Sequence, residues 1–349
     1  MFATRRYLKA PLISLAILGC GSSPISFQQE FETMGTVARV EIFHSDPAAA
    51  RAGFAAVEAV FDSVALLMST WNPASEISRL NHAPADSAFV LSDWVNRCLS
   101  DAEAVHEASE GAFDPTAEPL MRLWGFYRRE GRLPSEAEID SVRALLGGYE
   151  HDSAARSVVK KIPGTAFDFG GIAKGFAVDR AAEALRDLGI GDCLVDLGGN
   201  LFCLGSPPGK DRWRVGIRNP LDRDRLFASV ETSERAVATS GSYERFVTIG
   251  GHRYGHIMNP ATGRPAEGLL SATVLAPDAT LADGLSTALF VMGPERAKEL
   301  LARSYPGAEA ILVLPSEEGK SRVLISESLA GRVRILPEAE NEYAIETLR

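Results

Sequence analysis

The stretch DFGGIAKG at residues 168–175 is where the pattern of the chain first indicates a fold. Its glycines lead into apolar residues at helical spacing: Val178, Ala181, Leu185 and Leu188. This spacing predicts a helix. The apolar run Cys193 to Leu197 then predicts a strand, and Leu201 to Leu204 predicts a second strand with no helix between them. Two strands with no helix between them break the strict βα alternation of a doubly wound sheet.

The flanking segments extend this pattern in both directions. Toward the N-terminus, Val37 to Phe43 predicts a strand, and Pro47 to Ser69 and Ser92 to Glu110 predict helices, with Ser92 as an N-cap. Residues 128–148 are polar with a short helical patch and are expected at the periphery. Toward the C-terminus a helix is expected around Asp283 to Met292 and again over Pro294 to Ser304. Further strands are predicted at residues 213–217, near Val230, and at 236–239, 246–249, 271–275, 310–314, 323–325 and 333–335. Mixed helices and strands without strict alternation predict an α+β fold.

The N-terminus reads as a targeting segment rather than as part of the fold. Arg5, Arg6 and Lys9 precede a short apolar run that ends in Ile17-Leu18-Gly19-Cys20. This run looks like a bacterial lipobox, in which Cys20 is lipidated. A plain signal peptide with a coincidental cysteine is the alternative. We therefore expect a signal peptide over residues 1–19, a lipidated tether over 20–30 and one catalytic domain over 31–349.

Composition limits the possible partners. Removal of the three basic residues of the leader takes the net charge from −10 to −13, which disfavours nucleic acid. An anionic nucleotide can still bind if a metal and backbone amides supply local positive charge. Apart from Cys20 the chain has Cys98, Cys193 and Cys203 and no Cys-x-x-Cys, so neither zinc nor a redox dithiol is indicated. No later apolar stretch of about 20 residues predicts a membrane span.

The glycine-rich stretch itself can be interpreted in two ways. Glycines allow a backbone to approach a phosphate, and the N-terminus of a helix favours anions, with Lys174 adding a charge. The stretch is neither a Walker A motif nor a Gly-x-Gly-x-x-Gly motif. From the residues alone, a tight turn before a helix is the simpler interpretation.

A histidine and a carboxylate–hydroxyl pair stand in the C-terminal half. His256 precedes a turn that runs from Asn259-Pro260 to Gly263. Asp283 and Thr287 share one helix face at i and i+4. Mg²⁺ takes such oxygen ligands and commonly combines few protein ligands with substrate phosphates. Each feature also has an ordinary structural explanation: a packed or surface histidine, and a local hydrogen bond on a helix.

Taken together and in order, these segments resemble the ApbE family, the FAD:protein FMN transferases. The resemblance spans about residues 31–315. The matching motifs are Met34-Gly35-Thr36, Ser69-Thr70-Trp71, Phe113-Asp114-Pro115-Thr116, Asp168 to Gly175 with Ala177-Val178-Asp179, Asp196 to Asn200, Ser240-Gly241, His256 to Gly263 and Ala282 to Thr287. Alone, Ser240 to Glu244 reads as a turn and Trp71 as a core residue.

The resemblance implies an α+β, T-fold-type unit with two lobes that binds FAD as substrate and Mg²⁺ as cofactor. It implies that His256 is the catalytic base and that Gly171, Asp283 and Thr287 hold the metal, Gly171 through its carbonyl. Residues expected to contact FAD are Met34, Trp71, Phe113, Asp114, Pro115, Asp168, Lys174 and Ile257. Trp71 stands where members often carry tyrosine, so stacking should persist.

The implied reaction moves FMN from FAD to a Thr or Ser hydroxyl of a partner flavoprotein and releases AMP. The expected partner is a subunit of a membrane redox complex. The expected location is the periplasmic side of the bacterial envelope, through Cys20. Two alternatives remain from the residues: a pyrophosphatase that splits FAD into FMN and AMP, and a non-catalytic periplasmic FAD-binding lipoprotein. A solute receptor would need two similar α/β lobes, which the pattern does not show.

Overall fold

The computed structural model describes residues 24–128, 130–316 and 319–348. The leader, Cys20 and the start of the expected tether lie outside these residues. The helices are α1 (Pro47–Met68), α2 (Glu76–His82), α3 (Asp93–Ala108), α4 (Glu118–Leu123), α5 (Glu136–Arg143), α6 (Ala173–Asp187) and α7 (Ala279–Ser304), with short 3-10 turns at Glu327–Leu329 and Pro337–Ala339. None of these helices has both the length and the apolarity that crossing a membrane requires.

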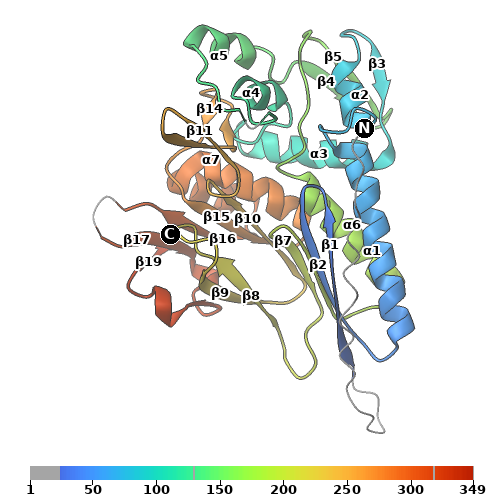
Figure 1. Ribbon diagram of the computed structural model, residues 1–349, viewed down its shortest axis with the longest axis vertical. Helices are drawn as coiled ribbons and strands as arrows, with labels where there is room; N and C mark the ends of the chain where they lie inside the picture. The colour runs from blue at the N-terminus through green and yellow to red at the C-terminus, as the bar shows by residue number, and fades with distance from the viewer. Residues whose placement is uncertain (1–23, 129, 317–318, 349) are drawn as a thin grey trace.

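One nine-stranded sheet forms the centre of the molecule (Figure 1). All neighbouring strands in it run antiparallel except β17 and β19, which are parallel. Its order is β1 (Ile25–Thr33), β2 (Thr36–His44), β6 (Cys193–Leu197), β7 (Asn200–Leu204), β10 (Arg235–Gly241), β15 (Ser271–Ala276), β16 (Glu309–Leu314), β17 (Ser321–Ser326) and β19 (Tyr343–Leu348). The predicted α+β class is therefore confirmed.

Both faces of the sheet are covered, which explains why the central strands β7 and β15 are buried along their whole length. Helices α1, α6 and α7 pack on one face. The other face carries a three-stranded sheet of β8 (Trp213–Arg218), β9 (Leu226–Thr232) and β18 (Val333–Ile335). In β7, Phe202 points to the helical core and Cys203 to the opposite core, so a side chain on either face is buried.

Smaller elements surround this core. They are the sheet of β3 (Ala88–Val90), β5 (Ser157–Lys160) and β4 (Tyr149–Asp152), and the hairpins of β11 (Phe246–Ile249) with β12 (His252–Gly255) and β13 (Met258–Asn259) with β14 (Arg264–Pro265). A third apolar cluster around Trp124 joins α4 and α5 to these hairpins, above α7 in Figure 1. The segment after residue 128 that we expected at the periphery contains α5.

The helix boundaries follow the sequence signals. Asp46 caps α1 by accepting a hydrogen bond from the backbone N of Ala48 at 2.8 Å, and Pro47 takes the first position. Ser92 stands at the predicted N-cap of α3, but its hydroxyl makes no capping bond. In α7, Gly293 has φ 74° immediately before Pro294, which produces the predicted break.

The structure corrects the predicted tether. Residues 25–30 belong to β1 and pair with β2 along its full length, so the folded unit begins before residue 31. The sequence pattern did not predict this strand because β1 is a polar edge strand with few apolar residues. Phe27 and Phe31 turn toward the core, while Gln28 and Glu30 are exposed. The three described cysteines are buried and free.

Candidate active site

The metal-ligand candidates come together where α6 begins beside α7. Asp283 is buried on α7, and its Oδ2 accepts a hydrogen bond from the backbone N of Gly175 at 3.0 Å. Gly171 lies against Thr287, because a Cβ on Gly171 would be 3.1 Å from Thr287 Oγ1. The i, i+4 pair and the glycine therefore lie together in space.

A cation already lies beside this carboxylate. Lys174 Nζ is 3.5 Å from Asp283 Oδ2 and donates to the carbonyl of Gly170 at 3.0 Å. The described residues contain no group of three or more His, Cys, Asp or Glu side chains placed to hold a metal. A metal bound here would therefore combine one carboxylate, hydroxyl and carbonyl oxygens, and oxygens from a substrate.

The start of α7 is fixed by a buried aspartate on α6. Asp179 accepts hydrogen bonds from the backbone N of Ala279 and of Thr280, at 2.7 and 2.8 Å, and from the Thr280 hydroxyl at 2.5 Å. Burial raises the pKa of Asp179 to about 6. Because these bonds lie one turn before Asp283, they determine where that ligand is placed.

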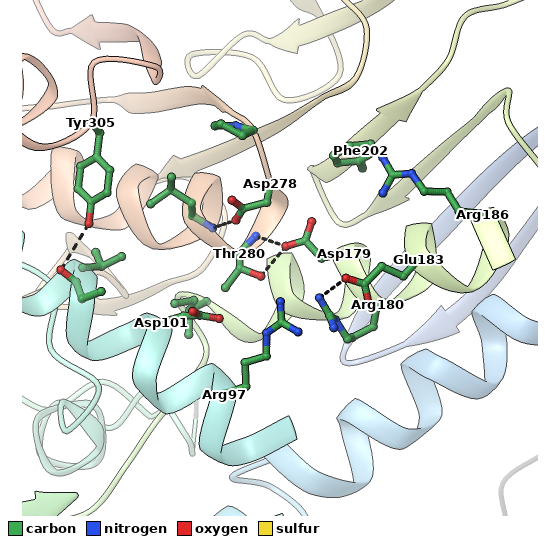
Figure 2. Close-up of a pocket in the computed structure, with 15 residues that line it drawn as sticks. Arg97, Asp101, Asp179, Arg180, Glu183, Arg186, Phe202, Asp278, Thr280 and Tyr305 are labelled. Carbon is green, nitrogen blue, oxygen red and sulfur yellow. Dashed lines mark hydrogen bonds and ion pairs between the residues drawn. The ribbon is translucent and has the colours of Figure 1, made fainter. Parts of the chain in front are cut away.

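Figure 2 shows this cap inside a hollow of about 360 Å³ between α3, α6 and the start of α7. Arg97, Asp101, Arg180 and Glu183 line it, and none of the predicted site residues does. A second hollow, of about 480 Å³ beside Trp124 and Tyr254, also lacks them. The candidate active site is therefore distinct from both hollows.

The predicted flavin-contacting residues form a second group next to the first. The ring of Phe113 lies 3.1 Å from the Cβ position of Gly171. The backbone N of Asp168 donates to the carbonyl of Pro115 at 2.9 Å, and Asp168 Oδ1 accepts from the backbone N of Gly170 at 2.6 Å. The motif at 113–115 and the glycine-rich stretch are thus held together by hydrogen bonds.

Tyr127 joins this group, although no sequence pattern predicts it. Its hydroxyl donates to Asp168 Oδ2, and its ring packs edge-on against Trp71 at 5.2 Å between centroids. Burial and the charge of Asp168 raise the pKa of Tyr127 well above its ordinary value, so the phenol stays a donor. Trp71 is 59% exposed, which leaves an indole face open for a flat ligand.

Two of the predicted flavin contacts are engaged elsewhere. Asp114 Oδ1 accepts from the backbone N of Thr116 at 2.7 Å and from its hydroxyl at 2.5 Å, which stabilises a local turn. Ile257 is 6% exposed with its side chain in the main core, and its carbonyl accepts from the backbone N of Ala266. Because both side chains are engaged, Asp114 and Ile257 are available at the site through their backbone atoms and their shape rather than through a free side chain.

Met34 and Gly35 form the two-residue turn between β1 and β2. Their φ values are 47° and 71°, as a turn with two left-handed residues requires. The tip reaches the loop before β11, because a Cβ on Gly35 would lie 3.6 Å from an Arg245 guanidinium nitrogen. This contact links the first predicted motif to the histidine.

His256 follows β12 and is half-buried. Its backbone N donates to the carbonyl of Arg245 at 3.1 Å, and its Nδ1 lies 3.2 Å from the same oxygen. Because a carbonyl only accepts, this contact places a proton on Nδ1 and leaves the Nε2 lone pair free. Burial, with the charges of Arg245 and Lys174, lowers the pKa of His256 to about 4, so the ring is neutral at pH 7.

Ser240, which reads as a turn residue in the sequence, lies at the metal-ligand group. Its Oγ is 2.8 Å from Ser286 Oγ and 3.2 Å from Thr287 Oγ1. Only the pairing of β10 with its neighbours brings it to α7, so no local pattern could reveal this role.

Comparison with known proteins gives one consistent result. Residues 34–312 match the model of the ApbE family. The chain is 32% identical over 307 residues to the FAD:protein FMN transferase of Salmonella typhimurium, covering 85% of this chain and 87% of that protein. The Treponema pallidum protein of the same name is 33% identical, with 87% of each chain covered.

Solved structures agree with the sequence relatives. The flavin transferase ApbE from Vibrio cholerae has a TM-score of 0.78 at 29% identity, over 88% of this chain and 99% of that one. The apo form of the Pseudomonas stutzeri flavinyl transferase ApbE has a TM-score of 0.79 at 32% identity, over 89% and 97%.

Proposed function

The chain belongs to the ApbE family, and from that premise we propose that it is an FAD:protein FMN transferase. The finer proposal is that it uses Mg²⁺, joins FMN to a Thr or Ser hydroxyl of a partner flavoprotein through a phosphoester, and releases AMP. One observation carries this proposal most directly. A buried carboxylate, a helix hydroxyl and the start of α6 converge around Lys174, whose charge also acts on a neutral histidine.

The donor set suits a magnesium ion. Asp283, Thr287 and the carbonyl of Gly171 offer only oxygen, the ligand that a hard cation prefers. The Lys174 ammonium, 3.5 Å from the Asp283 carboxylate, marks this position as one where positive charge is favourable. When bound, Mg²⁺ neutralises charge on the pyrophosphate and aids departure of AMP.

The second group suits the flavin. Trp71 offers an exposed indole face, and Tyr127 holds it through edge-on packing. The ring of Phe113 lies against Gly171, and Met34 lies at the tip of the β1–β2 turn. A planar ring placed on Trp71 would then direct its phosphate chain toward the oxygen donors of α7.

The chemical step assigned to the chain is a proton transfer. His256 Nε2 takes the proton of the acceptor hydroxyl while that oxygen bonds to the phosphorus of the FMN half. The bond from this phosphorus to the bridging oxygen breaks, and its electron pair leaves with AMP. The proton on Nδ1, held by the Arg245 carbonyl, keeps Nε2 as the basic atom.

The acceptor and the location are also proposals. We propose as acceptor a flavoprotein subunit of a membrane redox complex, and as location the periplasmic face of the envelope, with Cys20 as lipid anchor. The run Ile17 to Cys20 after a basic start supports the anchor. A Cys20→Ala variant should move from the membrane fraction to the soluble fraction and lose labelling by a palmitate analogue, whereas unchanged fractionation would contradict the anchor.

The test of the activity uses His256→Ala with His252→Ala as a matched control on the same hairpin. His256→Ala should keep FAD binding and lose transfer by ~10²–10⁴-fold, measured as the mass of an acceptor peptide. His252→Ala should behave like the unaltered protein. Near-normal transfer by His256→Ala would refute the role of the histidine, and AMP with free FMN in place of labelled peptide would indicate a pyrophosphatase.

A further inference from the structure

Arg245 occupies a distinctive place beside the histidine. It lies in the loop between β10 and β11, and its carbonyl holds both the backbone and Nδ1 of His256. Its side chain extends to the tip of the β1–β2 turn, where a guanidinium nitrogen lies 3.6 Å from the position that a Cβ on Gly35 would take. The same residue therefore contacts the catalytic histidine and the first motif of the site.

The guanidinium of Arg245 is uncompensated in the described part of the chain. The residue is exposed, and within residues 24–128, 130–316 and 319–348 no carboxylate lies within ion-pair distance of it. Lys174 and Arg253, in contrast, each have a side-chain partner. Lys174 lies against Asp283 at 3.5 Å, and Arg253 packs over the ring of Phe246 at 4.7 Å. Arg245 is thus a free cation at the edge of a site that must take a pyrophosphate.

We propose that Arg245 is a catalytic residue of the transfer, whose guanidinium binds phosphate oxygens of the FAD pyrophosphate and brings the phosphorus to His256. This inference rests on the proposed function. The planar fork of arginine matches phosphate oxygens with two parallel hydrogen bonds, which a lysine ammonium cannot do. The bound guanidinium also stabilises the charge that develops as AMP departs.

The position of Arg245 next to His256 also affects the pKa of the proposed base. Two charged groups act on His256: Arg245 from its own loop and Lys174 from α6, and both lower its pKa. A base with a pKa near 4 is a weak proton acceptor, although it is fully deprotonated at pH 7. Burial is the largest cause of this lowered pKa, and the charge of Arg245 adds to it. When a pyrophosphate neutralises Arg245, the contribution of that charge is lost, so the pKa of His256 rises and base catalysis is more effective. Arrival of the substrate thereby activates the histidine.

The experiment compares Arg245→Gln and Arg245→Lys with Arg253→Gln, which removes an arginine of the β11–β12 hairpin that follows the Arg245 loop. Transfer to an acceptor peptide is measured with FAD and Mg²⁺. Arg245→Gln should lower kcat by about 100-fold or more, as loss of one transition-state donor does, and Arg245→Lys should recover only part of this. Arg253→Gln should match the unaltered protein.

A second readout does not depend on activity. The imidazole of His256 is titrated by NMR without and with inorganic pyrophosphate, with His256→Asn to assign its signal. In the unaltered protein, pyrophosphate should raise the titration midpoint. In Arg245→Gln, the midpoint without ligand should already be higher, and the rise should be smaller.

The two readouts separate the possible failures. Unchanged kcat in Arg245→Gln, or a His256 midpoint that responds to pyrophosphate equally in both proteins, would overturn the role of Arg245. Absence of any transfer by the unaltered protein would overturn the proposed function instead, and the titration would still decide whether Arg245 binds a pyrophosphate.

Discussion

Replacing Gly175 with alanine should weaken both the fold and the metal site. A Cβ at this position would lie 2.0 Å from the carbonyl oxygen of Ala279 and 2.8 Å from Cβ of Asp283. Because the first clash is with backbone, α6 and α7 must separate by about 1 Å to reach the shortest tolerated contact. Overpacking of this kind costs ~1–3 kcal/mol, and a backbone clash belongs at the upper end, about 3 kcal/mol.

The expected size follows from the length of the chain. At an unfolding entropy of about 2.1 cal/mol/K per residue, 349 residues give about 0.7 kcal/mol/K, so Tm should fall by about 4 °C. The shift also lengthens the 3.0 Å bond from the backbone N of Gly175 to Asp283. Loss of such a supporting bond to a metal ligand should weaken Mg²⁺ binding by ~10–100-fold.

Differential scanning calorimetry and Mg²⁺ titration of Gly175→Ala test this, with Gly191→Ala as control. A Cβ on Gly191 meets no atom within 4 Å, so this variant should stay within about 0.5 kcal/mol of the unaltered protein. If Gly175→Ala had the Tm and the Mg²⁺ affinity of Gly191→Ala, close contact between α6 and α7 would not be what places Asp283.

Three further predictions concern pH and flavin binding. Burial raises the pKa of Asp179 to about 6, against about 3.9 in the unfolded chain, so the folded state holds an extra proton between these values and its stability falls as pH rises through them. This contribution should lower the urea midpoint of the unaltered protein at pH 7 relative to pH 4.5, and Asp179→Asn should lack it. An equal difference between the two pH values in both proteins would show that Asp179 makes no such contribution. The pKa of His256 near 4 against about 6.5 unfolded gives the opposite sign, with stability lost as pH falls below about 6.5. In the free enzyme kcat/KM should accordingly stay level from pH 8 to about 5, whereas a half-maximal value near 6.5 would show a charged histidine. Trp71→Ala should raise the Kd for FAD by ~3–10-fold in fluorescence quenching while Trp71→Phe retains most affinity, and equal Kd values for both would exclude stacking.

The sequence predicts most of the helices because each shows its buried face as a local period. In α1, Phe54, Val57, Phe61 and Val64 step by three and four and all become buried. The break at Gly293 is equally local, because proline at 294 cannot continue the hydrogen bonds of the preceding turn. Short or edge elements carry weaker signals, so β1, α2 and the strands β12, β13 and β14 were not predicted, although β11 was.

The residues of the site likewise divide into those that a local sequence pattern predicts and those that it does not. Asp283 and Thr287 could be paired from the sequence because one helix carries both. Arg245, Tyr127 and Ser240 could not be placed at the site, because sheet order and loop packing bring them there from separate segments. The long-range order of the nine strands, which sets these distances, has no local signature.

The most direct measurement is the intact mass of an acceptor peptide with a central threonine after incubation with FAD, Mg²⁺ and the protein without its first 20 residues. We expect the added mass of an FMN phosphoester, release of one AMP per label, and loss of both with EDTA or in Asp283→Ala. An unlabelled peptide with intact FAD under conditions in which FAD binds would contradict this expectation.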